Sequence, residues 1–311
     1  MNEITNSQVP YPIISVIIPF HGSKNDLQSC LKALQNQKFN LPFEIITVES
    51  GNDNELNQLK FLPNVILVSS SSLLFPGAAR NLGVSNSNTE LLAFTDADCV
   101  PSPNWISDIY SALKNGNELV VGSITNLYPF HPIASVDNLL QFADFQKYRK
   151  SNITHFPGCN FGITKTLFMK TGGFPDRFKN GEDVLFSEAA IKKSNSGILY
   201  NPAIVVKHSG RKNIKGLLLH NKILGYYRGY LGLKLTKDNR FRGSFLYSFL
   251  FGVRRLVYTT LKTLQWNPMG ILRLIFFFPF VIIGLSAWVK GFREGNQKFL
   301  TDGLISERGQ D

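Results

Sequence analysis

The sequence has few cysteines, no recognisable secretory leader and no dinucleotide-binding glycine motif. Its 311 residues include three cysteines, Cys30, Cys99 and Cys159, and none lies in a CxxC pair, so neither a disulfide framework nor a zinc site is indicated. The polar start, MNEITNSQVPYP, lacks the basic and apolar regions of a signal peptide. No GxGxxG follows the first apolar run, where IPFHGSKNDL stands, which argues against a nicotinamide-dependent dehydrogenase. These absences fit a reducing compartment.

Acidic residues are also in short supply relative to basic ones. The chain has 33 Lys and Arg against 22 Asp and Glu, which gives a net charge of +11 and predicts an anionic partner such as a nucleotide, a nucleic acid or an acidic lipid. The positive residues are spread out and concentrate beyond residue 207. Attraction to anionic membrane lipids explains that distribution more simply than nucleic-acid binding, so we expect no nucleic-acid partner.

The first 210 residues alternate short apolar runs with a helical pattern. The runs at 13–20, 44–50, 65–70 and 90–98 are typical of strands, and 25–37 has the apolar spacing of an amphipathic helix. This alternation predicts an α/β domain over residues 1–212, built on a mostly parallel sheet. Because ligands of such sheets bind at the carboxyl ends of the strands, we expect His21, Glu49 to Gly51 and Asp96 to Asp98 to line one crevice.

Asp96 and Asp98 form a D-x-D pair directly after the apolar run LLAF. Carboxylates at i and i+2 of an extended strand point to the same side, where their repulsion is costly unless a cation lies between them. Mg²⁺ or Mn²⁺ prefers such oxygen ligands and leaves positions open for substrate phosphates. The alternative is a solvated turn with an Asx cap.

Residues 213–311 have a different character, which predicts a helical, membrane-associated region. A helix over about 244–264 places Phe245, Phe249, Val253, Leu256, Thr260 and Leu264 on one face, as an interfacial helix does, with Arg254, Arg255 and Lys262 available to face lipid phosphates. The 16 uncharged residues at 274–289 predict a span or a re-entrant hairpin, with a kink at Pro279. A buried helix of a soluble domain is the alternative for the same segment.

The ordered set of motifs resembles glycosyltransferase family 2 over residues 13 to about 210. The motifs are SVIIPFHGSKNDLQSCLKALQNQ, EIITVESG, AARN, the D-x-D pair and the stretch GCNFGITKTLFMKTGGFPDRFKNGEDVLFSEAAIKKS. The resemblance implies a GT-A fold, a Rossmann-like sheet flanked by helices. It also implies inverting transfer of a sugar from a nucleotide-diphospho-sugar, with a UDP-sugar favoured.

The resemblance also assigns the donor side of the site. Pro19, Phe20 and His21 would border the nucleotide. Glu49, with Gly51 beside it, stands where the family usually has an Asp that contacts the base, and this departure leaves the base identity open. Arg80 would pair with the diphosphate or with a D-x-D carboxylate, unless it is an ordinary surface residue of a helix.

On the metal and acceptor side, the resemblance makes Asp98 the ligand of Mn²⁺ or Mg²⁺, with Asp96 placing the ribose or the metal. Asp183 would be the general base and Glu182 would orient the acceptor or a loop, although acids in a first helical turn also favour the helix dipole. His208 would be a further metal or phosphate contact, unless it is structural.

Three further residues, Gly158, Cys159 and Asn160, would shape the acceptor floor, and Trp105 would stack on a sugar, unless they only pack. No Q-x-x-R-W motif of processive synthases occurs in residues 184–311, which favours transfer of a single sugar. We therefore expect a membrane-associated glycosyltransferase with its catalytic domain in the cytoplasm, which acts on a glycan or lipid-linked acceptor in envelope polysaccharide or glycolipid synthesis. The alternative is a catalytically inactive, membrane-bound nucleotide-sugar-binding protein.

Overall fold

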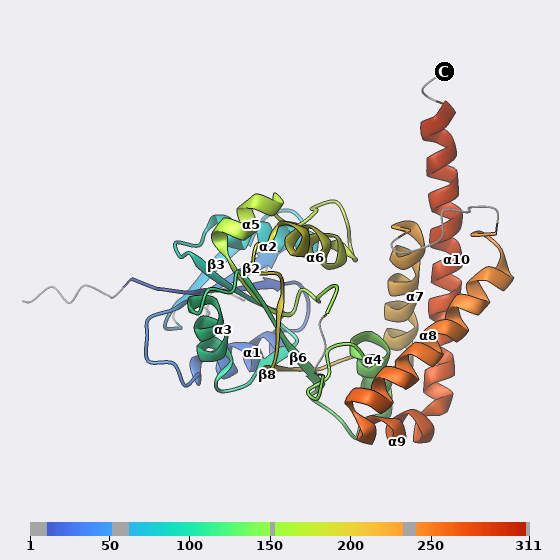
Figure 1. Ribbon diagram of the computed structural model, residues 1–311, viewed down its shortest axis with the longest axis horizontal. Helices are drawn as coiled ribbons and strands as arrows, with labels where there is room; N and C mark the ends of the chain where they lie inside the picture. The colour runs from blue at the N-terminus through green and yellow to red at the C-terminus, as the bar shows by residue number, and fades with distance from the viewer. Residues whose placement is uncertain (1–10, 52–61, 150–152, 233–240, 309–311) are drawn as a thin grey trace, which may run out of the picture.

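The computed structural model describes residues 11–51, 62–149, 153–232 and 241–308, and it shows a sheet half followed by a helical half (Figure 1). The strands are β1 (Ser15–Phe20), β2 (Glu44–Ser50), β3 (Val65–Ser70), β4 (Leu91–Thr95), β5 (Cys99–Pro101), β6 (Leu119–Asn126), β7 (Asn160–Thr164) and β8 (Leu199–His208). They form a single sheet in the order β3-β2-β1-β4-β7-β6-β8-β5.

The sheet is mixed, with its parallel part at the amino-terminal end. β1 pairs in parallel with β2 and β4, β2 with β3, and β6 with β8, whereas β7 runs antiparallel to both β4 and β6. The parallel arrangement predicted for the first four strands is therefore confirmed. The reversed β7 was not predicted, and it matters because its first residue, Asn160, lies opposite Thr95 at the end of β4.

Helices cover both faces of the sheet. α2 (Pro76–Ser85), α5 (Lys165–Thr171) and α6 (Glu182–Lys193) lie on one face, and α1 (Lys24–Gln35) and α3 (Trp105–Lys114) lie on the other (Figure 1). Phenylalanines fill the space beneath the first group: the Phe94 and Phe161 rings stack at 4.4 Å between centroids, and those of Phe174 and Phe186 at 4.0 Å. Such aromatic pairs add stability beyond the area they bury, and they fix α6 against the sheet.

The helical half consists of α7 (Ile214–Tyr230), α8 (Phe245–Trp266), α9 (Pro268–Phe276) and α10 (Phe278–Arg308). α7 and α10 lie close together because glycines face the partner backbone. A Cβ on Gly225 would lie 2.1 Å from the Trp288 carbonyl oxygen, and one on Gly295 would lie 2.0 Å from that of Tyr226. One helix of the sheet half, α4 (Pro132–Phe142), packs into the same core through Val136, Leu139 and Leu140, against Leu217, Leu274 and Val281.

The apolar segment 274–289 is broken, as the predicted kink requires, but the break does not lie at Pro279. The chain bends by 86° between α9 and α10, at Phe277, and Pro279 lies in the first turn of α10. A proline is tolerated there because the first N–H groups of a helix have no intrahelical acceptor. Within the described ranges no single helix is long and apolar enough to cross a bilayer, although the bent pair Pro268–Phe276 and Phe278–Asp302 meets those criteria jointly.

Candidate active site

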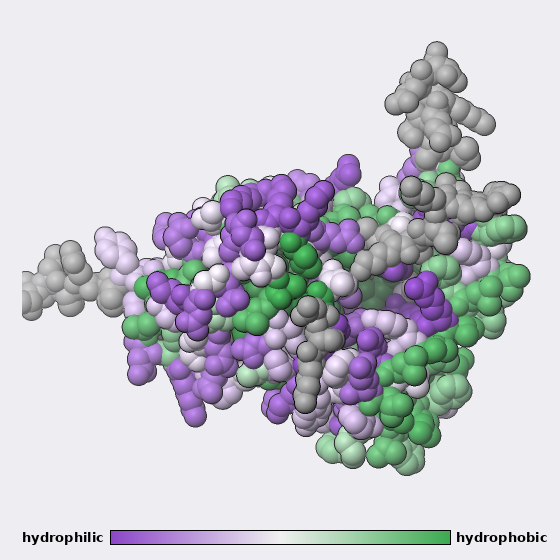
Figure 2. Space-filling model, in the orientation of Figure 1, coloured by the Kyte–Doolittle hydropathy of each residue, from purple (hydrophilic) through white to green (hydrophobic). Residues whose placement is uncertain are grey.

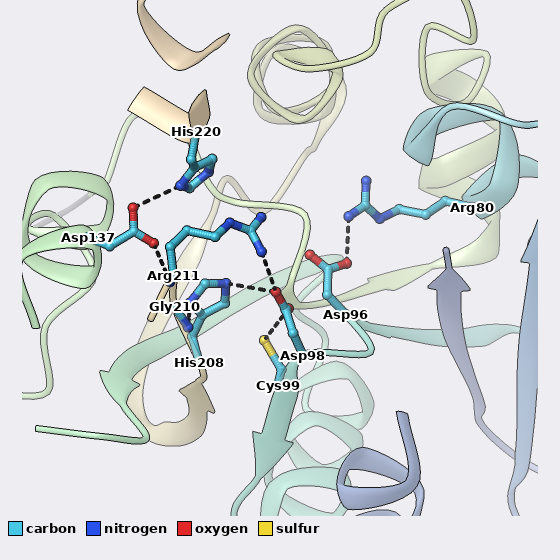
Figure 3. Close-up of polar contacts among 9 residues, drawn as sticks. All are labelled: Arg80, Asp96, Asp98, Cys99, Asp137, His208, Gly210, Arg211 and His220. Carbon is cyan, nitrogen blue, oxygen red and sulfur yellow. Dashed lines mark hydrogen bonds and ion pairs between the residues drawn. The ribbon is translucent and has the colours of Figure 1, made fainter. Parts of the chain in front are cut away.

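A buried arginine joins two carboxylates that are far apart in the sequence. Arg80, on α2, contacts Asp96 after β4 at 2.7 Å and Glu182 at the start of α6 at 2.8 Å (Figure 3 for the first contact). Burial alone would lower the pKa of Arg80, but attraction to the two carboxylates outweighs it and raises that pKa above its ordinary value. Of the roles considered for Arg80, pairing with a D-x-D carboxylate is confirmed, and the surface position is wrong.

Gly158 makes room for this guanidinium. The residue precedes β7, which the antiparallel pairing brings to the end of β4. A Cβ at this position would lie 2.7 Å from the Arg80 Cζ atom, closer than real side-chain contacts allow. The Phe174 ring also lies against the guanidinium, with 5.3 Å from Cζ to the ring centroid. The planar group is therefore enclosed, and both its position and that of Gly158 are fixed.

Asp183 lies next to Glu182 in the first turn of α6 and is held by backbone donors. Its carboxylate accepts hydrogen bonds from the Gly158 N–H at 3.2 Å and from the Val184 N–H at 2.8 Å. Burial, opposed by attraction to Arg80, raises the pKa of Asp183 above its ordinary value, and burial followed by repulsion from Asp183 does the same for Glu182. A carboxylate with a raised pKa is a stronger base than a solvated one, which suits proton removal.

Asp96 and Asp98 diverge, which corrects the prediction that they point to the same side. β4 ends at Thr95, not at residue 98, and the two acids belong to a turn closed by a hydrogen bond from the Cys99 N–H to the Asp96 carbonyl. Asp96 turns to Arg80, whereas Asp98 lies 3.4 Å from the His208 Nε2 atom (Figure 3). The repulsion between the two carboxylates is therefore relieved by separate partners, Arg80 for Asp96 and His208 for Asp98. The sequence had suggested that a metal ion would relieve it.

Asp98, Cys99 and His208 bring possible ligand atoms within 4.8 Å of one another. Cys99 is a poor ligand for a hard cation, because its hydrogen bond with Cys159 and its burial raise its pKa and keep the thiol protonated. The His208 Nδ1 atom accepts the Gly210 N–H at 3.1 Å, so the neutral ring carries its hydrogen on Nε2, toward Asp98. The Asp98 carboxylate is thus the group that fits Mn²⁺ or Mg²⁺, which bind through one or two carboxylates together with substrate phosphates.

The expected donor-side residues meet at the ends of β1 and β2. Phe20 and Glu49 are register partners and both are buried, and Pro19 precedes them on β1. The His21 Nδ1 atom donates to the Ser50 carbonyl at 3.2 Å. Gly51 has φ +112°, a conformation that suits glycine at this sharp exit from the strand. The structure therefore brings these residues together, while their contacts with a nucleotide stay a prediction.

Trp105 does not stack on a ligand, contrary to one of the two roles considered for it. Its side chain is fully buried, and its Nε1–H donates to the Asn160 Oδ1 atom at 2.8 Å. The Asn160 amide in turn donates to the carbonyls of Ser123 and Ile204. These bonds place both residues in the packed core, where they connect β7 to α3, β6 and β8.

A pocket of about 450 Å³ begins at Asp183 and extends between the two halves of the chain. Its lining residues in the helical half were not predicted as site residues: Tyr227, Arg228, Phe251, Arg254, Arg255, Tyr258 and Trp288. Arg255 corrects a specific expectation, because its guanidinium does not face lipid phosphates. It lies 4.8 Å from the Trp288 ring centroid and donates to the Leu140 carbonyl at 2.9 Å. No motif marks these positions in the sequence.

Comparison with curated proteins finds glycosyltransferases. The chain is 26% identical over 188 residues to glycosyltransferase AglE of Haloferax volcanii, a match that covers 58% of this chain and 61% of AglE. It is 21% identical over 222 residues to the pre-mycofactocin glycosyltransferase of Mycobacterium tuberculosis, covering 68% of this chain and 46% of that protein. The matches therefore span about half to three fifths of these relatives.

Solved structures share the fold at low sequence identity. S. aureus TarS 1–349, solved with UDP-GlcNAc, has a TM-score of 0.53 and 16% identity, covering 93% of this chain and 92% of that TarS fragment. The mannosyltransferase PcManGT of Pyrobaculum calidifontis, solved with GDP-Man and Mn²⁺, has a TM-score of 0.58 and 13% identity, covering 92% of this chain and 88% of PcManGT. The fold is that of GT-A glycosyltransferases. Since the family model for glycosyl transferase family 2 matches residues 15–172, more than half of the chain, the protein belongs to that family.

Proposed function

We propose that the chain is an inverting glycosyltransferase that moves a single sugar from a nucleotide-diphospho-sugar to an acceptor hydroxyl. The observation that carries the proposal is the position of Asp183. Its carboxylate is oriented by two backbone N–H groups, has a pKa raised by burial, and lies in the wall of the pocket between the two halves. The neighbouring Glu182 is joined to the D-x-D turn through Arg80. Family membership and the nucleotide-sugar ligands of TarS and PcManGT support the donor class.

In the proposed reaction, Asp183 accepts the proton of the acceptor hydroxyl, and the hydroxyl oxygen of the acceptor attacks the anomeric carbon of the donor sugar. The bond from that carbon to the nucleotide diphosphate breaks, and the configuration inverts. Arg80 and Glu182 hold the start of α6, and therefore the base, against the D-x-D turn. Asp98 would hold Mn²⁺ or Mg²⁺, which would stabilise the charge on the departing diphosphate.

We further propose that the helical half associates with a membrane and that the sheet half lies on its cytoplasmic side. The exposed surface of α8 is apolar, whereas its packed surface is small or polar: Phe249 and Val257 are 47% and 51% exposed, and Ser248, Gly252 and Thr259 are buried. Figure 2 shows hydrophobic surface gathered on the helical half. This arrangement is the reverse of a soluble amphipathic helix and suits contact with lipid. A membrane location would suit glycolipid or envelope polysaccharide synthesis.

Replacing Asp183 by asparagine tests the proposed base. The amide has nearly the same shape but cannot accept the proton, so we expect transfer to fall by at least about 100-fold while UDP binding is unchanged. The purified protein would be screened in detergent against a panel of nucleotide sugars with Mn²⁺ and Mg²⁺, with release of nucleotide as the readout. Wild-type rates in Asp183→Asn would exclude the base assignment, and absence of turnover with every donor would favour an inactive binding protein.

A further inference from the structure

The pocket between the two halves has a strongly basic wall. Arg228 on α7 and Arg254 and Arg255 on α8 all line it, together with Asp183. Within the part of the chain that the structure describes, none of the three arginines forms an ion pair with a carboxylate. The three guanidinium groups therefore share one cavity without a matching anion.

Burial and the nearness of the other guanidinium groups disfavour the charged forms of Arg228 and Arg255. Burial and then repulsion from Arg254 lower the pKa of Arg228, although Glu188 attracts it from beyond ion-pair distance. Burial and then repulsion from Arg228 lower the pKa of Arg255 to about 9. The Nε atom of Arg255 is buried without an acceptor among the described residues. Holding cations in this way is costly, and a bound anion would remove that cost.

The acids of the same pocket cannot serve as that anion. Asp144 is paired with Arg149 at 2.9 Å and accepts the Tyr258 hydroxyl at 2.7 Å. Asp183 accepts its two backbone N–H groups at the start of α6. Among the described residues that line the pocket, no acid is therefore left to neutralise the three arginines, and an anion from outside the chain would do so.

Phosphate is the anion that matches this wall. Guanidinium groups bind phosphate oxygens through paired, charge-assisted hydrogen bonds. The cavity of about 450 Å³ lies in the size range of small-molecule sites. The aromatic side chains of Tyr227, Phe251 and Trp288 also line the pocket, so its wall has an apolar part that suits a sugar ring or an alkyl chain.

The charge distribution also sets the orientation of such a ligand. Asp183 would repel a phosphate, so the anionic end binds at the arginines and a neutral hydroxyl end lies at Asp183. We propose that this pocket binds the acceptor and that the acceptor carries a phosphate or diphosphate group, held by Arg228 and Arg254. The inference rests on the proposed function, because it assigns the hydroxyl at Asp183 as the group that is glycosylated.

Binding of octyl phosphate tests the inference directly. Trp288 lines the pocket, so quenching of tryptophan fluorescence reports occupancy, and saturating UDP with Mn²⁺ keeps the donor side filled. We expect octyl phosphate to bind the full chain at least tenfold more tightly than octyl glucoside. Arg228→Met and Arg254→Met should each weaken octyl phosphate binding at least tenfold and leave UDP affinity unchanged. Arg293→Met, at an exposed position outside the pocket, is the matched control.

The outcomes separate the inference from the proposed function. Equal binding of octyl phosphate and octyl glucoside, or equal loss in Arg293→Met, overturns the phosphate site even when donor turnover is normal. Loss of donor turnover with intact, arginine-dependent phosphate binding contradicts only the proposed function. Glucose 1-phosphate and inorganic phosphate identify the source: competition by either indicates a soluble phosphate, and its absence indicates a lipid-linked one. If Arg228→Met fails to fold, Arg254→Met decides, because that side chain is exposed.

Discussion

Replacing Arg80 by methionine removes the cation that joins the D-x-D turn to α6. The Arg80 side chain is 4% exposed. Its two partners differ in exposure: the Asp96 side chain is 30% exposed and the Glu182 side chain is 7% exposed. Removing one partner of a buried ion pair costs about 3–5 kcal/mol, because the other charge stays buried without its counter-charge. Asp96 can regain water, so most of the cost falls on Glu182. We expect the free energy of unfolding to decrease by about 3 kcal/mol at neutral pH.

The size of this loss should depend on pH, because Glu182 is an acid whose pKa is raised on folding. Below its unfolded pKa of 4.5 such a group is protonated in both states and does not lower the free energy of unfolding. As the pH rises from there toward the folded pKa, the free energy of unfolding decreases. Without Arg80 the folded pKa rises further, so the decrease extends to higher pH. Burial raises the pKa of Glu182 to about 7 in the wild type, so the difference between wild type and Arg80→Met stays near its low-pH value up to about pH 7 and grows as the pH rises above it. The double variant Arg80→Met/Glu182→Gln should regain part of the loss at neutral pH.

Urea unfolding in detergent, followed by circular dichroism across this pH range, measures these differences. Arg177→Met is the control, since Arg177 is exposed and contacts the ring of Phe178, 5.0 Å from the centroid. A loss of no more than about 1 kcal/mol, the value of an exposed ion pair, would refute the reasoning. So would a loss that is the same at every pH.

Three other changes test separate parts of the structure. Gly158→Ala places a Cβ 2.7 Å from the Arg80 Cζ atom and should cost about 1–3 kcal/mol of stability by thermal unfolding, together with most of the transfer activity. Asp98→Ala should abolish the increase in UDP affinity that Mn²⁺ gives, as measured by calorimetry. Phe249→Glu with Val257→Glu should reduce flotation with anionic liposomes at least tenfold, because two charges then stand on the exposed face of α8.

Each of these changes has an outcome that contradicts it. Gly243→Ala controls for the glycine, since its nearest neighbours would lie at 3.5 Å, and equal effects of the two substitutions would remove the special role of Gly158. UDP affinity that responds to Mn²⁺ equally in Asp98→Ala and wild type would exclude Asp98 as the ligand. Phe130→Glu adds a charge at a residue that is 88% exposed in the sheet half, and an equal loss of flotation there would locate the lipid contact elsewhere.

The sequence predicted those parts of the molecule that depend on local patterns. The first three strands, the helix at 25–37 and the helix that begins with Glu182 and Asp183 follow from apolar spacing and capping, and the structure contains them. The donor-side residues meet as expected because the carboxyl ends of parallel strands share one edge of a sheet. Family membership followed from the order of these motifs along the chain.

Contacts over long sequence distances could not be predicted in this way. Arg80 and Glu182 are 102 residues apart, and the reversed direction of β7 brings Gly158 against the Arg80 guanidinium. The different directions of Asp96 and Asp98 depend on where β4 ends, which is the least reliable part of a strand prediction. Similarly, the inward direction of Arg255 depends on how α8 packs against α10, which composition alone does not specify.

The packing of α4 has a consequence for how the chain can be divided. Its residues Val136, Leu139 and Leu140 are buried against Leu217, Leu274 and Val281, so severing the chain after residue 212 would expose an apolar surface on the part that remains. The sheet half would then carry an apolar stripe on α4 without its cover. Homologues with a different helical half should carry a different apolar stripe on the helix equivalent to α4. The sequences of that helix and of the helical half should therefore vary together.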